Sequence, residues 1–469
     1  MAAKLDTKIY PGNIINNEFV STPTTRRSIN PATGEPLFEV PVARPEDLDA
    51  AVRAARQAFK SWSITPFDER AKLLLKYADI IEANRGELEK LLTIEQGKPL
   101  SLSNTEMNCA LTWLRTFATM EIKDEVLKED DEKIIYSTHP PIGVCAGIVP
   151  WNWPIVLSIG KLGPALITGN TFIMKPSPFT PYCDLKLGEL AMHIFPPGVV
   201  QVLLGDDNLG PWITEHPHID KISFTGSIPT GKLVAASCAK TLKRYVLELG
   251  GNDPAIVCED VDIDRCLPKI AMLSFLNSGQ ICILTKRIYV HEKIYDEFRD
   301  KMVQHTKNHI KTGEGFGKDV VVGPVQNKIS DLVKDLYAQI DKCNWNTALA
   351  ESPSSAKGYF ITPAIIDNPP EDSRIVVEES FGPIVPLLKW SDENDVIERA
   401  NALRTGLGAS RLVRRLEAGS VWVNSHFDVA PDVPCGGHKE SGIGMEWGIE
   451  GLKHYTNSRS LWVRKNVFV

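Results

Sequence analysis

Cys282 is the first residue whose surroundings suggest chemistry. It ends the segment 277–282 (NSGQIC), a polar, glycine-containing stretch that follows an apolar run typical of a helix. A thiol that acts as a nucleophile needs a base and a group that binds an oxyanion. An isolated cysteine is more often a small buried hydrophobic residue, so the position alone favours a structural role.

Glu248 is the second candidate, and it lies in the apolar segment 246–251 (VLELGG). A single acid with apolar neighbours is usually a charge at the edge of a strand. The alternative is a partly buried carboxylate with a raised pKa, which is what a general base near neutral pH requires.

A glycine-flanked turn at 226–232 (GSIPTGK) nearly matches the P-loop of nucleotide triphosphatases. It follows an expected strand at 221–225 and precedes an expected helix at 233–242. Leu233 stands where a P-loop needs Ser or Thr for magnesium, and Pro229 removes one of the amides that hold phosphate. The remaining pattern suits the pyrophosphate of a dinucleotide at a helix N-terminus, although no G-x-G-x-x-G occurs.

Other chemistries have little support in the sequence. None of the nine cysteines forms a C-x-x-C pair, so no metal site is expected. His305 and His309 lack the Glu of a zinc-protease motif and are expected on a solvated helix face. No G-x-S-x-G element is present, which weakens a serine-hydrolase interpretation.

The elements that would position these residues follow an α/β pattern. Apolar spacing predicts helices over 45–59 and 68–81, and short apolar runs predict buried strands at 143–149, 171–174, 199–204 and 221–224. Buried strands that alternate with helices indicate a parallel, doubly wound sheet. The uncharged stretch 140–160 contains four prolines, so it is expected to be a strand, a tight turn and a helix start, with no membrane span.

Two strand-like segments have no obvious partner, at 121–139 and 454–469. They could pair with each other or with another subunit, or form an ordinary surface hairpin and tail.

Composition limits the remaining possibilities. With 469 residues, 43% of them hydrophobic, the chain can form two or three covered domains. The net charge of −7 argues against a nucleic-acid partner. The first ten residues carry charges and no apolar core, and the cysteine count is odd, so we expect no secretion signal and a cytoplasmic location.

Seven segments, taken together, resemble the motifs of the aldehyde dehydrogenase family, in the family's order and over nearly the whole chain. They are 150–154 (PWNWP), 175–177 (KPS), 224–231 (FTGSIPTG), 248–251 (ELGG), 279–282 (GQIC), 379–383 (ESFGP) and 436–444 (GGHKESGIG). The resemblance implies an α/β fold with a Rossmann-type cofactor-binding domain (1–120 and 140–250), an α/β catalytic domain (251–453) and a small β oligomerisation element (121–139 and 454–469).

The resemblance also implies a reaction: oxidation of a small-molecule aldehyde to a carboxylic acid. Cys282 would attack the carbonyl and carry a thioester, while the Asn152 amide and the Cys282 backbone N–H would hold the oxyanion. Glu248 would activate the water that hydrolyses the thioester. Lys161 and Glu446 match family positions assigned to positioning or proton relay.

The cofactor would be NAD, with NADP possible because Pro178 replaces the acid that many NAD-preferring members place on the adenosine ribose. The cofactor-binding positions carried over from the family are Trp151, Lys175, Ser177, Gly226, Ser227, Gly231, Leu249, Glu379 and Phe381. A homodimer or homotetramer is expected, without a nucleic-acid or membrane partner.

The positions carried over for the substrate funnel are Trp153, Leu157, Ile281, Ile283, Phe427, Val429 and Cys435. Gly160 takes a place often filled by a bulky aromatic residue, so a roomy, apolar funnel and an aliphatic or aromatic aldehyde are expected. Cys435 likewise replaces a usual aromatic residue, and Met445 a frequent arginine.

The connection between Ser410 and Val421 is shorter than in the family and implies a missing strand end and helix turns. This leaves an inactive relative with a structural or binding role as one alternative. The other is a P-loop nucleotidase, which Leu233 opposes.

Overall fold

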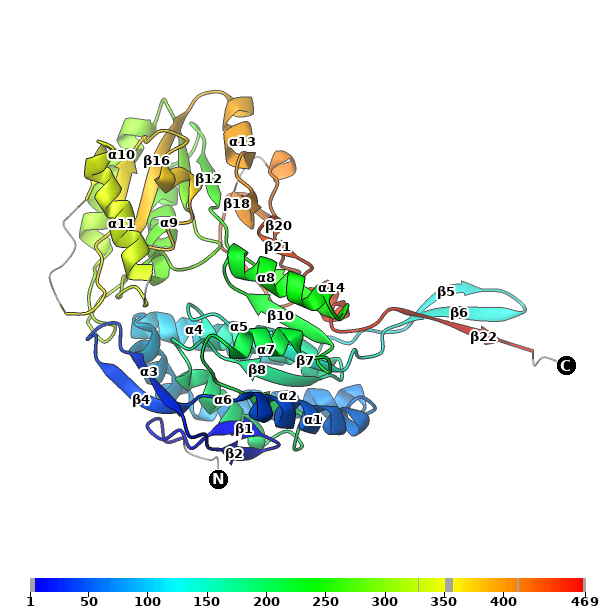
Figure 1. Ribbon diagram of the computed structural model, residues 1–469. Coiled ribbons are helices and arrows are strands. Elements are labelled where there is room, and N and C mark those ends of the chain that lie inside the picture. The colour runs from blue at the N-terminus through cyan, green and yellow to red at the C-terminus, as the bar shows by residue number, and fades with distance from the viewer. Residues whose placement is uncertain (1–4, 328, 351–356, 411–412, 467–469) are drawn as a thin grey trace.

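The computed structural model describes residues 5–327, 329–350, 357–410 and 413–466. It consists of two α/β lobes and a β arm that projects from their side (Figure 1).

The first lobe is built on an eight-stranded sheet, in the order β2-β1-β9-β8-β7-β10-β11-β21. Its central strands are parallel; in sheet order they are β9, β8, β7, β10 and β11. The hairpin β1–β2 and the short β21 add antiparallel edges. The strands predicted around 143–149, 171–174, 199–204 and 221–224 are confirmed. The bounds are β1 Asn13–Ile15, β2 Glu18–Val20, β7 Val144–Ile148, β8 Thr171–Lys175, β9 Val200–Val202, β10 Lys221–Thr225, β11 Arg244–Glu248 and β21 Gly442–Ile443.

Helices cover both faces of this sheet, which explains why β7 and β8 are buried throughout. The helices α1, α7 and α8 share one apolar cluster, and α2 to α6 share the other. The predicted helices over 45–59 and 68–81 are confirmed, and 140–160 forms β7, a turn and the start of α5. The bounds are α1 Pro45–Trp62, α2 Phe67–Ala83, α3 Arg85–Gln96, α4 Leu100–Phe117, α5 Pro154–Ile167, α6 Tyr182–Met192, α7 Leu209–Glu215 and α8 Ile228–Ala239.

The second lobe holds a seven-stranded sheet in the order β14-β15-β16-β13-β12-β18-β19, parallel except for the β14–β15 pair. The strands are β12 Pro254–Val257, β13 Arg287–His291, β14 Thr347–Leu349, β15 Ala364–Asp367, β16 Ile384–Trp390, β18 Gly408–Ser410 and β19 Ser420–Trp422. The helices are α9 Ile263–Phe275, η1 Leu276–Gly279, α10 Tyr295–His309, α11 Ile329–Lys342, α12 Arg374–Val377, α13 Glu393–Asn401 and η2 Val413–Arg415. The last helix, α14 (Gly448–Lys453), returns to the first lobe and packs against α5 (Figure 1). Within the described ranges, no helix is long and apolar enough to cross a membrane.

The connection from β18 to β19 is short, as the sequence predicted. The two strands are parallel neighbours, with Gly408 opposite Ser420 and Ser410 opposite Trp422. Between them the described residues form one 3₁₀ turn, η2, and no α-helix; residues 411–412 lie outside the description. Strand β18 pairs with β12 at a single position, Ala255 opposite Ser410.

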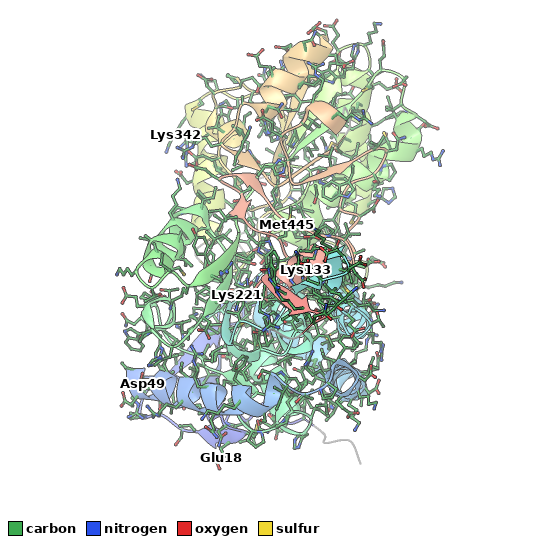
Figure 2. All side chains as sticks on the ribbon, turned by 90° about the vertical axis from the view of Figure 1, so that its right-hand side faces the viewer. Glu18, Asp49, Lys133, Lys221, Lys342 and Met445 are labelled. Atoms are coloured by element: carbon green, nitrogen blue, oxygen red, sulfur yellow. The ribbon has the colours of Figure 1, made fainter. Side chains whose placement is uncertain are left out.

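The arm consists of β5 (Glu125–Glu129), β6 (Lys133–Thr138) and β22 (Arg459–Arg464). Strand β22 pairs antiparallel with β6 along its whole length, so the two predicted strand segments do pair with each other. Figure 2 looks along the arm, with Lys133 in front of the body. Two small antiparallel sheets of two strands each complete the fold: β3 (Thr25–Ile29) with β4 (Pro36–Pro41), and β17 (Thr405–Gly406) with β20 (His438–Lys439).

Candidate active site

The carboxyl ends of four neighbouring strands meet at one edge of the first sheet. Ile148 of β7 lies opposite Lys175 of β8 and Phe224 of β10, and Thr225 lies opposite Glu248 of β11. The loops that follow these strands therefore leave the sheet side by side. In open α/β sheets this edge is where ligands bind.

A tight turn presents Cys282 to the same region. Helix α9 ends at Phe275, and the next residues include three successive left-handed ones: Asn277 (φ 51°), Ser278 (φ 59°) and Gly279 (φ 74°). A Cβ on Gly279 would lie 2.0 Å from the Gly382 carbonyl oxygen, so the turn requires glycine. We call residues 276–282 the nucleophile loop.

Asn152 is fixed against this loop. Its Nδ2 donates a hydrogen bond of 3.0 Å to the Gln280 carbonyl, and Asn277 Nδ2 donates one of 3.1 Å to the Asn152 carbonyl. An amide nitrogen has two hydrogens, so Asn152 keeps a second donor hydrogen beside the nucleophile loop. The structure thus brings Asn152, a predicted site residue, to the loop that carries Cys282.

A buried ion pair that the sequence did not reveal supports Asn152 from behind. Lys98 Nζ lies 2.5 Å from Glu106 Oε2 and donates to the Asn152 carbonyl at 2.9 Å. The other Glu106 oxygen accepts the N–H groups of Ile155 and Val156, at the start of α5. A single lysine and a single glutamate eight residues apart carry no motif, so only the fold identifies them.

Glu248 is buried, and this raises its pKa well above the usual range; Glu446 raises it further, and Lys161 acts in the opposite direction. One of its carboxylate oxygens accepts no hydrogen bond from the described residues. The sequence left open whether Glu248 is an edge charge or a buried base, and its position in the structure is that of a buried carboxylate.

Lys161 and Glu446 form a buried network beside Glu248. The Lys161 ammonium lies 2.5 Å from Glu446 Oε1 and donates to Thr225 Oγ1 at 2.8 Å. Ser223 Oγ donates to the same Glu446 oxygen at 2.5 Å. The two residues that the resemblance singled out are thus direct neighbours.

Burial also acts on Cys282. It raises the pKa of the thiol well above its usual value, and the carboxylates of Glu379, Asp253 and Glu248 raise it further. The thiol is therefore protonated at neutral pH in this state, so attack on a carbonyl requires a base to remove the proton.

The segment 436–444 packs against β11 and the residues that follow Glu248. Gly442 of β21 lies opposite Glu248, and the Leu249 N–H donates to the Ser441 carbonyl at 2.8 Å. Ser441 Oγ donates to the Gly250 carbonyl at 2.8 Å. Met445, which follows this segment, lies where the two lobes meet (Figure 2).

The predicted pyrophosphate turn lies at the N-terminus of α8. Ser227 caps the helix, with its Oγ accepting from the Thr230 N–H at 3.4 Å. A Cβ on Gly231 would lie 2.5 Å from the Leu249 side chain, so Gly231 allows α8 to pack against Leu249. Lys232, the P-loop lysine of the alternative interpretation, pairs with Glu440 at 2.9 Å, which does not favour that alternative.

The carboxyl end of β8, which β7 separates from β10 in the sheet, supplies a buried cation, Lys175. Burial lowers the pKa of Lys175 to about 8, with Arg26 also lowering it. Its ammonium donates to the Pro176 carbonyl at 3.1 Å, and Ser177 Oγ accepts from the Phe179 N–H at 3.3 Å. A helix N-terminus and a lysine at one sheet edge fit the phosphates and ribose of a dinucleotide.

The segment 379–383, which we call the clamp, comes from the second lobe. Glu379 accepts the Gly251 N–H at 3.2 Å, and burial raises its pKa to about 7. Phe381 packs edge-to-face on Trp151, with ring centroids 5.5 Å apart. Predicted cofactor residues from both lobes are thereby brought together.

The predicted substrate residues share one apolar cluster with Cys282. The Trp153 and Phe427 ring centroids are 6.4 Å apart. The remaining members of this group are Leu157, Ile281, Ile283, Val429 and Cys435.

The extra room expected beside Gly160 is not present. A Cβ on Gly160 would lie 2.8 Å from the indole nitrogen of Trp447, which packs edge-to-face on Trp113 with centroids 5.3 Å apart. The aromatic ring that Gly160 lacks is thus supplied by Trp447, from a distant part of the chain. The expectation of a roomy funnel is wrong at this position.

Comparison with known proteins gives a consistent result. The model of the aldehyde dehydrogenase family matches residues 19–461. Aldehyde dehydrogenase LUC3 of a Fusarium species is 40% identical over 466 residues, covering 97% of this chain and 98% of that protein. An NAD⁺ complex of aldehyde dehydrogenase from Bacillus cereus superposes with a TM-score of 0.94 at 36% identity, covering 98% of this chain and 97% of that one. A structure described as an NADP-dependent enzyme of E. coli gives 0.93 at 32% identity, covering 97% of this chain and 98% of that one.

Proposed function

Since the chain belongs to the aldehyde dehydrogenase family, whose members oxidise aldehydes with NAD(P), we propose that Cys282 is its nucleophile and Glu248 its hydrolytic base. The observation that carries this assignment is the convergence of Asn152, Cys282 and Glu248. The Asn152 amide is hydrogen-bonded to the nucleophile loop at 3.0 Å, and Glu248 acts electrostatically on the Cys282 thiol.

In the first half-reaction, the Cys282 sulfur attacks the aldehyde carbon as its proton passes to a neighbouring carboxylate. The second Asn152 Nδ2 hydrogen and the Cys282 backbone N–H stabilise the oxyanion that forms. Bound NAD(P) supplies the hydride acceptor. The acyl group then remains on Cys282 as a thioester.

In the second half-reaction, Glu248 removes a proton from water as the water oxygen attacks the thioester carbon. The C–S bond breaks, the carboxylic acid leaves, and Cys282 is regenerated. A buried carboxylate with a raised pKa is a stronger base than an exposed one, which suits this step. The free Glu248 oxygen provides an acceptor for the water.

The cofactor is proposed to lie along the sheet edge, with NAD used in preference to NADP. Lys175 and Ser177 would contact the adenosine ribose, while Gly226, Ser227 and the α8 N-terminus would hold the pyrophosphate. Glu379 would hold the nicotinamide ribose, with Trp151, Gly231, Leu249 and Phe381 shaping the walls. Pro178 leaves the ribose hydroxyls without an adjacent acid at that position.

The substrate is proposed to be an apolar aldehyde, because Trp153, Ile281, Ile283 and the residues packed against them form an apolar surface around Cys282. We further assign 1–120 and 140–250 to cofactor binding, 251–453 to catalysis, and 121–139 with 454–469 to assembly of a homodimer or homotetramer. A cytoplasmic location is proposed from the odd number of cysteines, nine in 469 residues.

The direct test is a panel of aliphatic and aromatic aldehydes with NAD and with NADP, following formation of reduced cofactor. Activity with at least one apolar aldehyde, absent in Cys282→Ala, is expected. Folded protein that oxidises none of them would contradict the proposal, and a higher kcat/KM with NADP would overturn the cofactor preference.

A further inference from the structure

Lys286 is a buried lysine near Cys282 that the mechanism above does not use. It directly precedes β13 and is 2% exposed. Its ammonium donates hydrogen bonds to the carbonyl oxygens of Gly279, at 2.6 Å, and Gly382, at 3.1 Å. Burial of an ammonium group is costly unless such bonds and nearby charges compensate for the lost water.

The two carbonyl groups belong to the two segments that matter most for the reaction. Gly279 lies in the nucleophile loop, three residues before Cys282, and Gly382 lies in the clamp. The backbones approach so closely that a Cβ on Gly279 would lie 2.0 Å from the Gly382 oxygen. Two carbonyl oxygens near one buried point repel each other, and the ammonium between them offsets this repulsion. The contact between loop and clamp therefore depends on Lys286.

The charges around Lys286 favour its protonated form. Burial lowers its pKa to about 7, while the carboxylates of Glu379 and Asp253 act in the opposite direction. Glu379 belongs to the clamp, and Asp253 accepts the Lys286 backbone N–H through its carbonyl at 3.1 Å. The clamp thus meets Lys286 twice, through the Gly382 carbonyl and through the Glu379 charge.

We propose that Lys286 is a positioning residue that couples occupancy of the cofactor clamp to the placement of Cys282. A movement of Gly382 when a ribose fills the clamp is passed through the Lys286 ammonium to Gly279, and from there to Cys282. The proposal rests on the assignment of Cys282 and the clamp made above. The coupling is reciprocal, since an effect of the ligand on the loop implies an equal effect of the loop on ligand affinity.

The test measures how fast iodoacetamide alkylates Cys282, with and without saturating ADP-ribose and in the absence of any aldehyde. ADP-ribose keeps the ribose that the clamp would hold but lacks the nicotinamide ring, which would shield the sulfur. Mass spectrometry of the peptide that contains Cys282 separates this thiol from the other cysteines. We expect ADP-ribose to change the alkylation rate of the wild type by roughly fivefold or more. In Lys286→Met, the ratio of the rates with and without ADP-ribose should be about one.

Two further variants keep the test decisive. Lys286→Gln keeps donor hydrogens but has no charge and a shorter side chain. The ratio of its alkylation rates with and without ADP-ribose should therefore lie closer to one than that of the wild type. This variant replaces Lys286→Met if Lys286→Met does not fold. Lys186→Met is the matched control, because Lys186 is also 2% exposed and donates to a backbone carbonyl, that of Ile9, at 2.7 Å. It should keep the wild-type ratio.

The coupling would be overturned if ADP-ribose did not change the alkylation rate of the wild type. It would also be overturned if Lys286→Met, or Lys286→Gln used in its place, showed the same rate ratio as the wild type. The assay needs no turnover, so its outcome is independent of the aldehyde panel. Protein that shows the coupling but oxidises no aldehyde would contradict the proposed function alone.

Discussion

Burial acts in one direction on the titrating acids at the centre of the site. It raises the pKa of Cys282 and Glu248 beyond their usual ranges and that of Glu379 to about 7. Because the nucleophile and the base both react in their deprotonated forms, kcat should rise with pH across the neutral range. A pH profile of kcat checks this, and a rate that falls as pH increases from 6 to 8 would contradict it.

The two half-reactions can be separated by two substitutions. Cys282→Ala should abolish formation of reduced cofactor, since no thioester can form. Glu248→Gln should slow turnover by about 10²–10⁴-fold, the usual contribution of a general base. The first turnover should still release up to one equivalent of reduced cofactor, and intact-protein mass should show the acyl group on Cys282. Turnover of Glu248→Gln at the wild-type rate would contradict the assignment, and loss of the burst would show that Glu248 also deprotonates the thiol.

Gly160 offers a test of the packing around Trp447. A Cβ there would lie 2.8 Å from the indole nitrogen, so Gly160→Ala should lower the free energy of unfolding by about 1–3 kcal/mol through overpacking. Gly86→Ala is the matched control, because Gly86 is also helical and a Cβ there meets nothing within 4 Å. Thermal melts of the two variants should move apart, and equal shifts would show that Trp447 adapts without cost.

At the scale of elements, the sequence predicted those strands, helices and motifs that depend on residues close together in the chain. Continuous apolar runs identified β7, β8 and β10, and the prolines at 150 and 154 separated the strand β7 from helix α5. The motifs made Cys282 and Glu248 candidates because each motif is contiguous in the sequence. The pair Lys98–Glu106 and the bridge made by Lys286 were not predictable, since they depend on contacts between distant segments. The pairing of β1 with β9 was missed for the same reason.

The β18–β19 connection is the element at which we expect a change to increase stability most. It holds no α-helix among its described residues, and β18 pairs with β12 at one position only. A longer β18 and a crossover helix would bury apolar surface, which contributes about 25 cal/mol per Å². An insertion that lengthens the connection toward the family's length should raise the melting temperature, with little change in kcat. An unchanged or lower melting temperature would show that the fold has already adapted to the short connection.

At the scale of the whole molecule, a single copy of the chain leaves both edges of the arm unpaired in the part that the structure describes. Strands β5 and β22 form its two open edges, and apolar side chains stand exposed on both of them: Val126, Leu127, Leu461, Trp462 and Val463. Open edges with exposed apolar residues pair readily with another chain. The arm also projects away from the body, where none of the other described residues of the chain covers it (Figure 1).

We therefore expect a homo-oligomer that depends on the arm. Light scattering of the wild type should give a mass that is a multiple of 52.0 kDa. Trp462→Glu places a charge on a residue that is 62% exposed in the single chain, so it should cost the monomer little while penalising an apolar contact between copies, and the mass should fall toward that of one chain. Ile64→Glu is the control, because Ile64 is 81% exposed and lies outside the arm; its mass should match the wild type. A wild-type protein that stays monomeric at micromolar concentration would refute the role of the arm. An oligomer that survives Trp462→Glu would place the main contact elsewhere on the surface.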